Sequence, residues 1–280
     1  MKLPTGIEKL DEMLSGGIGP NSSNLILTDP MVDKASFAQQ ILSTRLADGD
    51  KGIYVTTSKL PSMIIKNMYD HGWETKNITF VDCISFTLGV KTGEKYALKR
   101  KTLEVGAAWE ETMKIFEQAL KEVKGFKFAV FDCLETFMGV GADKIAEKLN
   151  ELKTLMKETR TTCLYLLTNW NYKEKDIKKI RNAVDCVIEL GTVEKKLLWM
   201  NYFFVDQKPK VFFVITDTGV NLYVPKILIT GPFHAGKSSI AKVLSEKAIS
   251  VDRLGTTVAL DHGYVEKKGL VCDIFGTPGQ

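Results

Sequence analysis

Lys226-Ile-Leu-Ile-Thr-Gly231-Pro-Phe-His-Ala-Gly236-Lys237-Ser238-Ser239 is the stretch around which this chain is organised. It predicts a buried strand, a loop of the form G-x-x-x-x-G-K-S and the first turn of a helix. In such a P-loop, backbone N–H groups and a helix N-terminus surround a phosphate chain, and the lysine reaches the terminal phosphates. A chance glycine loop is the alternative, but the apolar Ile240, Val243 and Leu244 supply the helix that a P-loop requires. The stretch therefore predicts a site for a nucleoside phosphate.

The loop and the start of its helix contain the residues that we expect to contact the nucleotide. They are Gly231, Pro232, Phe233, His234, Ala235, Gly236, Lys237, Ser238 and Ser239. The hydroxyl group of Ser238 occupies the motif position that ligates Mg²⁺.

Composition leaves the partner of the protein open. The chain has 280 residues, 44% hydrophobic content and a formal net charge of +4, which suit a soluble globular protein of one large or two ordinary domains. Its five cysteines are odd in number and never form a C-x-x-C pair, so we expect buried, reduced thiols in a cytoplasmic protein. No apolar run approaches the roughly 18 residues of a membrane-spanning helix, and we expect no membrane span.

The N-terminal part resembles a known family. Residues 5–18 read T-G-I-E-K-L-D-E-M-L-S-G-G-I, and they are similar to the segment that precedes the first core strand in the KaiC-like branch of RecA-type ATPases. The strand around Leu25-Ile-Leu and the helix that carries Phe37, Ile41 and Leu42 then stand where that family keeps its own P-loop. The resemblance covers about residues 4–224 in the order of elements.

This first loop departs from the family pattern. It reads Thr28-Asp-Pro-Met-Val-Asp33-Lys34-Ala35-Ser36, so only the lysine of the motif survives. Asp33 places a carboxylate beside the expected phosphate position, and Ala35 lacks the hydroxyl group that would ligate a metal ion. We interpret the loop as a relic with weak or no triphosphate binding. The alternative is that Lys34 and Ser36 still hold a nucleotide in a shifted pose.

Two further positions bear on catalysis in the first domain. The strand Gly52–Thr56 continues as Thr57-Ser58-Lys59, where the resembling family has a pair of glutamates that activate water. The sequence therefore predicts no general base there. Asp132 ends the strand 126–132 and resembles the Mg²⁺-holding aspartate of such ATPases, or it is only an inherited polar residue at a strand end.

The pattern of strands and helices predicts the fold class. Strands and helices alternate up to about residue 181, which is typical of a parallel α/β sheet, and strands alone follow from 184 to 224. We predict a RecA-like domain over residues 1–224. A second P-loop domain would occupy 225–280.

The second segment resembles the Ras-like small GTPases, particularly a prokaryotic branch. The residues that carry this resemblance are Thr256-Thr-Val-Ala-Leu-Asp261 and Gly276-Thr-Pro-Gly-Gln280. The resemblance implies that Thr257 senses Mg²⁺ and the γ-phosphate, that the N–H group of Gly279 contacts the γ-phosphate, and that Gln280 orients the catalytic water. Alternatively, the threonine simply begins a strand and the glycines shape a turn.

The same segment also departs from the GTPase pattern. Such GTPases usually have a D-x-x-G-Q pattern in switch II, the segment that contacts the γ-phosphate, and in this register Gly276 stands at its aspartate position. A literal D-x-x-G is present at Asp273–Gly276, but it would place Thr277 where the glutamine belongs. Phe233 is bulkier than the glycine often found at its position, and we expect it to slow turnover by crowding the hydrolytic water. The guanine-reading motifs of such GTPases are not found before residue 280, so we expect an incomplete, Ras-like domain.

Together these features predict a nucleotide-dependent switch. GTP or ATP with Mg²⁺ would bind the P-loop at 231–239, and the first domain would dock a protein partner or self-associate. The alternative is an ATP-driven RecA-type protein that acts on nucleic acid through Lys34 and Asp132. The basic segment 91–101 would fit such contact, but we favour a solvated surface because Tyr96 is its only ring for stacking.

Overall fold

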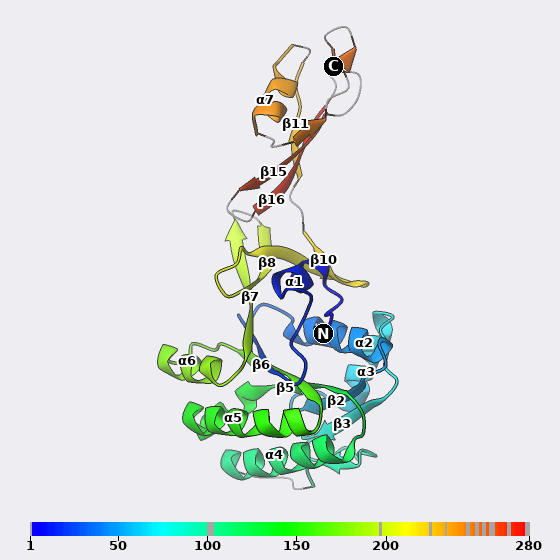
Figure 1. Ribbon diagram of the computed structural model, residues 1–280, viewed down its shortest axis with the longest axis vertical. Coiled ribbons are helices and arrows are strands. Elements are labelled where there is room, and N and C mark those ends of the chain that lie inside the picture. Colours follow the sequence, from blue (N-terminus) through cyan, green and yellow to red (C-terminus); the bar gives the residue numbers. More distant parts are fainter. Residues whose placement is uncertain are drawn as a thin grey trace. The chain divides into compact units, whose positions relative to one another are not determined.

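The computed structural model describes the chain except for residues 1, 100–103, 196–197, 224–225, 233, 245–246, 250–251, 254–255, 258–260, 268–269 and 278–280. The chain divides into two compact units (Figure 1). The first comprises Met1–Asp206 and Val214–Asn221, and the second comprises Gln207–Phe213 and Leu222–Gln280. These units differ from the domains that the sequence predicts chiefly at residues 207–213, which group with the later part of the chain.

A large, mostly parallel sheet is the scaffold of the first unit, although residues 211–213 of its strand β9 and Leu222 of β10 group with the second unit. Its strands are β1 (Ser23–Thr28), β2 (Lys51–Thr56), β3 (Ile78–Asp82), β4 (Tyr96–Ala97), β5 (Lys127–Asp132), β6 (Thr161–Thr168), β7 (Cys186–Lys195), β8 (Leu198–Val205), β9 (Val211–Thr216) and β10 (Gly219–Leu222). They lie in the order β10-β9-β8-β7-β1-β6-β5-β2-β3-β4. The pairs from β7 to β4 are parallel, and β8 runs antiparallel to β7. The predicted α/β fold with a parallel sheet is confirmed.

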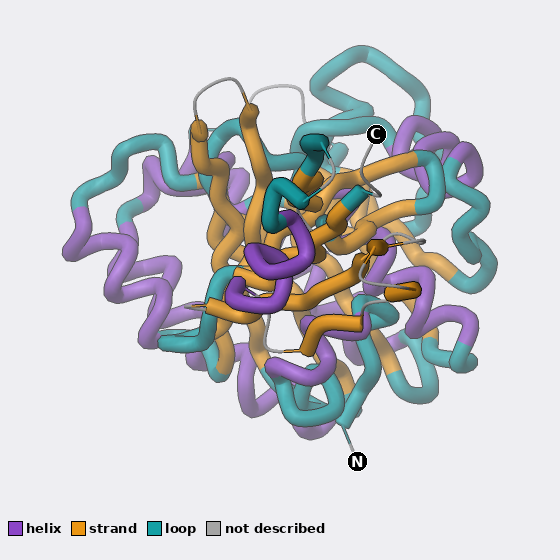
Figure 2. The backbone as a smooth tube through the Cα atoms, turned by 90° about the horizontal axis from the view of Figure 1, so that it is seen from above, coloured by secondary structure: helices purple, strands orange, loops and turns teal. Residues whose placement is uncertain are grey.

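Helices cover both faces of this sheet (Figure 2). They are α1 (Glu8–Met13), α2 (Lys34–Ala47), α3 (Pro61–Asp70), α4 (Val105–Glu122), the 3₁₀ helix η1 (Leu134–Val140), α5 (Ala142–Glu158) and α6 (Glu174–Asn182). Side chains of a strand alternate between its faces. Val55 therefore joins the apolar cluster beneath α4 and α5, whereas the neighbouring Tyr54 bonds to Gln39 of α2.

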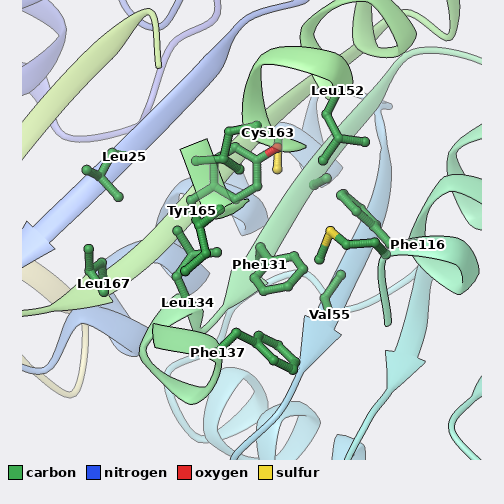
Figure 3. Close-up of a cluster of buried hydrophobic side chains, with 14 of the residues drawn as sticks. Leu25, Val55, Phe116, Phe131, Leu134, Phe137, Leu152, Cys163, Tyr165 and Leu167 are labelled. Carbon is green, nitrogen blue, oxygen red and sulfur yellow. The ribbon is translucent and has the colours of Figure 1, made fainter. Parts of the chain in front are cut away.

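Aromatic side chains fill the core between the sheet and α4 and α5 (Figure 3). The ring of Phe131 lies 5.7 Å from that of Phe116, 5.9 Å from that of Tyr165 and 6.2 Å from that of Phe137, measured between centroids. The apolar stripe on α4 that contains Trp109 is buried here. This packing anchors η1 directly after β5, because Leu134 and Phe137 are both buried in the cluster.

The parallel strands end together at one edge of the sheet. Thr28 of β1 pairs with Thr168 of β6, and Thr56 of β2 pairs with Asp132 of β5. Ligand sites of open α/β sheets form outside the carboxyl ends of such strands. The loop that begins at Asp29 therefore lies at the edge where a binding site is expected.

The second unit contains a smaller sheet and one helix among its described residues. Its elements are β11 (Lys226–Ile229), α7 (Lys237–Leu244), β12 (Lys247–Ile249), β13 (Asp252–Arg253), β14 (Thr256–Thr257), β15 (Asp261–Lys267) and β16 (Leu270–Gly276). The sheet has the order β11-β16-β15-β12, with β11 parallel to β16 and β15 antiparallel to it. In the described parts of the chain, no helix is both long and apolar enough to cross a bilayer.

Replacement of Phe131 by alanine tests the central role of this ring. We expect Phe131→Ala to lower the free energy of unfolding by roughly 3–5 kcal/mol, because the cavity left behind cannot collapse fully. Phe126, which precedes the same strand and is 58% exposed, provides the matched control. Phe126→Ala should cost less than about 1 kcal/mol. Equal losses in urea unfolding would show that Phe131 does not organise the core.

Candidate functional site

A cavity of about 490 Å³ opens at the carboxyl edge of the sheet in the first unit. Its lining includes Lys34, Lys59, Asp132, Glu135, Thr168 and Trp170. These residues follow or end four different strands, so the parallel sheet is what brings them together. The cavity lies where the sequence predicts the relic loop.

Asp33 caps the N-terminus of α2 with its side chain. Its Oδ1 atom accepts a hydrogen bond from the backbone N–H of Ser36 at 3.1 Å, and its Oδ2 atom accepts one from the hydroxyl group of Ser36 at 2.7 Å. In a phosphate-binding loop, such N–H groups at a helix start would face the ligand. Here a carboxylate side chain already satisfies one of them.

Lys34 is paired with a carboxylate from a distant part of the chain. Its ammonium group forms an ion pair with Glu135 of η1 and a hydrogen bond with the hydroxyl group of Thr168. Glu135 also accepts hydrogen bonds from the hydroxyl group of Thr168 at 3.0 Å and from its N–H group at 3.2 Å. Both charged side chains are largely buried, with 13% and 15% exposed. The positive charge that a P-loop offers to phosphates is neutralised internally.

Asp132 is a buried carboxyl group at the end of β5, in the lining of the cavity. It is 3% exposed, and its Oδ2 atom accepts a hydrogen bond from the hydroxyl group of Tyr54 at 2.8 Å. Burial raises the pKa of the Asp132 carboxyl group, although the hydrogen bond from Tyr54 opposes this shift. A proton therefore competes with any cation for this group.

A chain of hydrogen bonds joins the relic loop to Asp132. The side-chain amide of Asn67 donates to the hydroxyl oxygen of Ser36 at 3.2 Å and to Gln39 at 2.7 Å. Gln39 in turn donates to the hydroxyl group of Tyr54 at 3.3 Å. Ser36, which was one half of the shifted-pose alternative, thus already bonds to Asp33 and Asn67.

The residues of this cavity do not fit a magnesium triphosphate. Ala35 offers no hydroxyl group, Lys34 is already neutralised, and Asp33 places a negative charge at the helix start. These contacts agree with our interpretation of a relic loop.

The P-loop of the second unit has a different arrangement. The ammonium group of Lys237 donates to the carbonyl oxygens of Gly231 at 2.9 Å and Pro232 at 2.8 Å, and the residue is 8% exposed. His234 and Gly236 have positive φ angles of 58° and 74°, a backbone pattern typical of anion-binding nests. Among the described residues, the printed partners of the Lys237 ammonium group are neutral carbonyl groups. Phosphate binding by this loop stays a prediction.

The other predicted residues of the second site are described only in part. Phe233, Gly279 and Gln280 lie outside the described residues. Ser238 and Ser239 belong to the first turn of α7, and Thr257 lies in β14, which pairs with β13. The metal-binding roles of Ser238 and Thr257 therefore stay predictions.

Comparison with known proteins identifies the fold of the first unit. Residues 3–227 match the family described as "ATPase: KaiC". The chain belongs to this KaiC family. A UPF0273 protein of Pyrococcus furiosus is 26% identical over 249 residues, which cover 83% of this chain and 98% of the relative. The circadian clock oscillator protein KaiC of Prochlorococcus marinus is 34% identical over 82 residues, 29% of this chain and 16% of that protein.

A solved structure supports the same fold. A KaiC-like protein of Pyrococcus horikoshii has a TM-score of 0.61 and 18% identity, covering 80% of this chain and 99% of its own. The KaiC family match ends at residue 227, so the P-loop at 231–239 lies beyond it. The resemblance to KaiC-like ATPases is therefore confirmed, whereas the resemblance to small GTPases has no support from these comparisons.

Glu135, the partner of Lys34, is not predicted from the sequence as a site residue. Glu135 lies three residues after Asp132, just past the carboxyl end of β5. An acidic residue at this sheet edge, together with a lone lysine after β1, was the available signal. In the basic segment, Tyr96 is only 5% exposed and Lys95 pairs with Glu122, so both of these side chains have partners within the protein.

Removal of the carboxylate tests the buried ion pair. We expect Glu135→Ala to lower the free energy of unfolding by about 3 kcal/mol, because it leaves the buried ammonium group of Lys34 without a counter-charge. A double variant, Lys34→Met with Glu135→Leu, should recover most of the loss. Glu110→Ala, which breaks an exposed pair with Lys144, should cost less than about 1 kcal/mol. Urea unfolding followed by tryptophan fluorescence gives all three values, and a negligible loss for Glu135→Ala would contradict the assigned pairing.

Asp132 predicts a pH dependence of stability. Its raised pKa means that the folded state binds the proton more tightly than the unfolded state does. The contribution of this group to stability is therefore full below the pKa of the unfolded state, which is about 4, and it is lost as pH rises through the higher pKa of the folded state. Asp132→Asn removes this dependence.

The measurement is the difference in unfolding free energy between Asp132→Asn and the parent chain from pH 4 to pH 8. This difference should change in favour of the variant as pH rises. Asp70→Asn, at a side chain that is 57% exposed, controls for the loss of a surface carboxylate. A flat difference for Asp132→Asn would mean that the carboxyl group has an ordinary pKa.

Proposed function

We propose that this KaiC-family chain is a nucleotide-dependent switch. In this proposal the P-loop at 231–239 holds GTP or ATP with Mg²⁺, and the KaiC-like unit is a platform that docks a protein partner or self-associates. Two contacts support this assignment. Lys34 is neutralised by Glu135, whereas the described partners of Lys237 are neutral carbonyl groups, so we assign nucleotide binding to the second loop.

One observation carries the proposal. In the second unit, Ile229 at the end of β11 pairs with Gly276 at the end of β16, and the N–H group of Thr277 donates to the carbonyl oxygen of Ile229 at 3.0 Å. The segment that begins at Gly276 therefore starts beside the loop that follows β11. Switch segments must lie next to the phosphates whose loss they report. This placement supports assigning residues 276–280 to such a segment.

Each residue of the site has a role that follows from its chemistry. Lys237 would supply positive charge to the terminal phosphates, and Ser238 with Thr257 would hold Mg²⁺. We assign Gly279 to the γ-phosphate contact and Gln280 to orientation of water. Bound Mg²⁺ would neutralise negative charge on the phosphates.

Two observations favour different nucleotides, GTP and ATP. Residues 256–261 and 276–280 resemble small GTPases and favour GTP, whereas the KaiC family is one of ATPases and favours ATP. Family membership also supports a second candidate function, that of an ATP-dependent RecA-type protein which binds ATP in the cavity at Lys34. The pairing of Lys34 with Glu135 weighs against this second function.

Nucleotide binding by lysine variants of the full chain separates the two candidates. We expect Lys237→Ala to weaken binding of fluorescently labelled GTP and ATP by about 10- to 150-fold, because each charge-assisted contact to phosphate contributes about 1.5–3 kcal/mol. Lys34→Ala should leave the affinity unchanged, and so should Lys66→Ala, whose side chain is 80% exposed.

Fluorescence anisotropy titrations with and without Mg²⁺ give the affinities, and competition with unlabelled GTP and ATP gives the base preference. Loss of binding in Lys34→Ala but not in Lys237→Ala would overturn the proposal in favour of the RecA-type function.

A further inference from the structure

Glu135 occupies the place in the first cavity where a terminal phosphate would be expected. In a P-loop, the lysine contacts the terminal phosphates. Here the ammonium group of Lys34 contacts the Glu135 carboxylate instead. That carboxylate is further held by the hydroxyl and N–H groups of Thr168, at 3.0 and 3.2 Å. A cation and two neutral donors thus surround it, which is the kind of coordination that proteins offer to a phosphate oxygen.

Asp33 is a second carboxylate in the lining of the same cavity, it is exposed, and it comes from a different element. Its two oxygen atoms accept from the N–H and hydroxyl groups of Ser36. A helix N-terminus stabilises negative charge there through its N–H groups and dipole. The helix start and the lysine are the two anion-binding features of a P-loop, and each has a carboxylate of the protein as its partner.

The position of Glu135 is determined by packing. Leu134 and Phe137 on either side of it are 0% and 2% exposed, and both belong to the apolar core beneath α4 and α5. η1 therefore cannot shift without disturbing that core. A triphosphate that entered the cavity would meet two fixed negative charges and no uncompensated positive charge from Lys34.

We propose that Asp33 and Glu135 act as an internal anion that takes the place of a phosphate chain. They hold the relic loop and Lys34 in position in the absence of nucleotide, and they exclude nucleoside triphosphates from the first cavity. Asp33 and Glu135 are thus the residues that determine specificity at this site. Their negative charge, in addition to the loss of the loop glycines, excludes triphosphates from the cavity.

The test asks whether the first cavity gains affinity for a triphosphate when both carboxylates are replaced by amides of the same size. Asp33→Asn keeps an oxygen acceptor for the N–H group of Ser36, and Glu135→Gln keeps one for the N–H group of Thr168. Both changes are made in the full chain that also carries Lys237→Ala, so that the second P-loop cannot contribute. The result is then independent of whether the proposed switch function is correct.

The probes are fluorescently labelled ATP, measured by anisotropy, and unlabelled inorganic triphosphate as competitor. We expect the Asp33→Asn, Glu135→Gln variant to bind labelled ATP at least about tenfold more tightly than its Lys237→Ala parent. Inorganic triphosphate should displace the probe, which shows that the phosphate chain is what binds. The addition of Lys34→Ala should abolish the gain.

A matched control removes the same charge elsewhere. Glu110→Gln with Asp143→Asn also deletes one glutamate and one aspartate charge, from exposed ion pairs outside the cavity lining. This variant should bind no better than the parent. An equal gain in the control, or a gain that survives Lys34→Ala, would overturn the proposal.

A single variant keeps the test decisive if the double variant folds poorly. Asp33→Asn alone leaves the buried pair of Lys34 and Glu135 intact, and circular dichroism melting checks its fold. It should show a smaller gain in the same direction. No gain in a folded Asp33→Asn variant would mean that the charge of Asp33 does not exclude triphosphates.

Discussion

The ion pair between Lys34 and Glu135 is the contact on which the carboxyl edge of the first unit depends. It joins residues 101 positions apart and links α2 to η1, while Thr168 ties both to the end of β6. Buried charges are tolerated only when they are paired and hydrogen-bonded, and this pair meets both conditions. The contact that holds the cavity lining together is therefore also the one that neutralises the charge of Lys34.

The two P-loop lysines of the chain differ in what holds them. Lys34 faces a carboxylate that cancels its charge, whereas Lys237 is held by the carbonyl groups of Gly231 and Pro232, which are only dipoles. An anion that approaches Lys237 can replace neutral acceptors, but one that approaches Lys34 must displace a charge. The two loops thus differ in charge balance, and the family match covers only the first.

Membership of the KaiC family concerns the fold of the chain, whereas the contacts of the first cavity concern a few polar side chains. The family is visible in the order of elements and in the parallel sheet, which arise from apolar periodicity. Catalysis depends on a few polar side chains at strand ends, and these change without disturbing the core. Ala35 and Asp33 can thus stand in an ATPase scaffold whose strands, from β1 to β7, still pair in parallel.

The sequence by itself determined the elements, the family and the loss of the first loop's glycines, because these are local patterns of spacing and residue type. The strand Gly52–Thr56 and the strand that ends at Asp132 both appear in the sheet as predicted. Only the tertiary structure decided the partner of Lys34. Glu135 lies in a 3₁₀ helix that has no marked periodicity, and it reaches the lysine only because parallel strands end at one edge. The acidic residue and the lone lysine are visible in the sequence, but nothing in it shows that they meet, because they lie 101 positions apart.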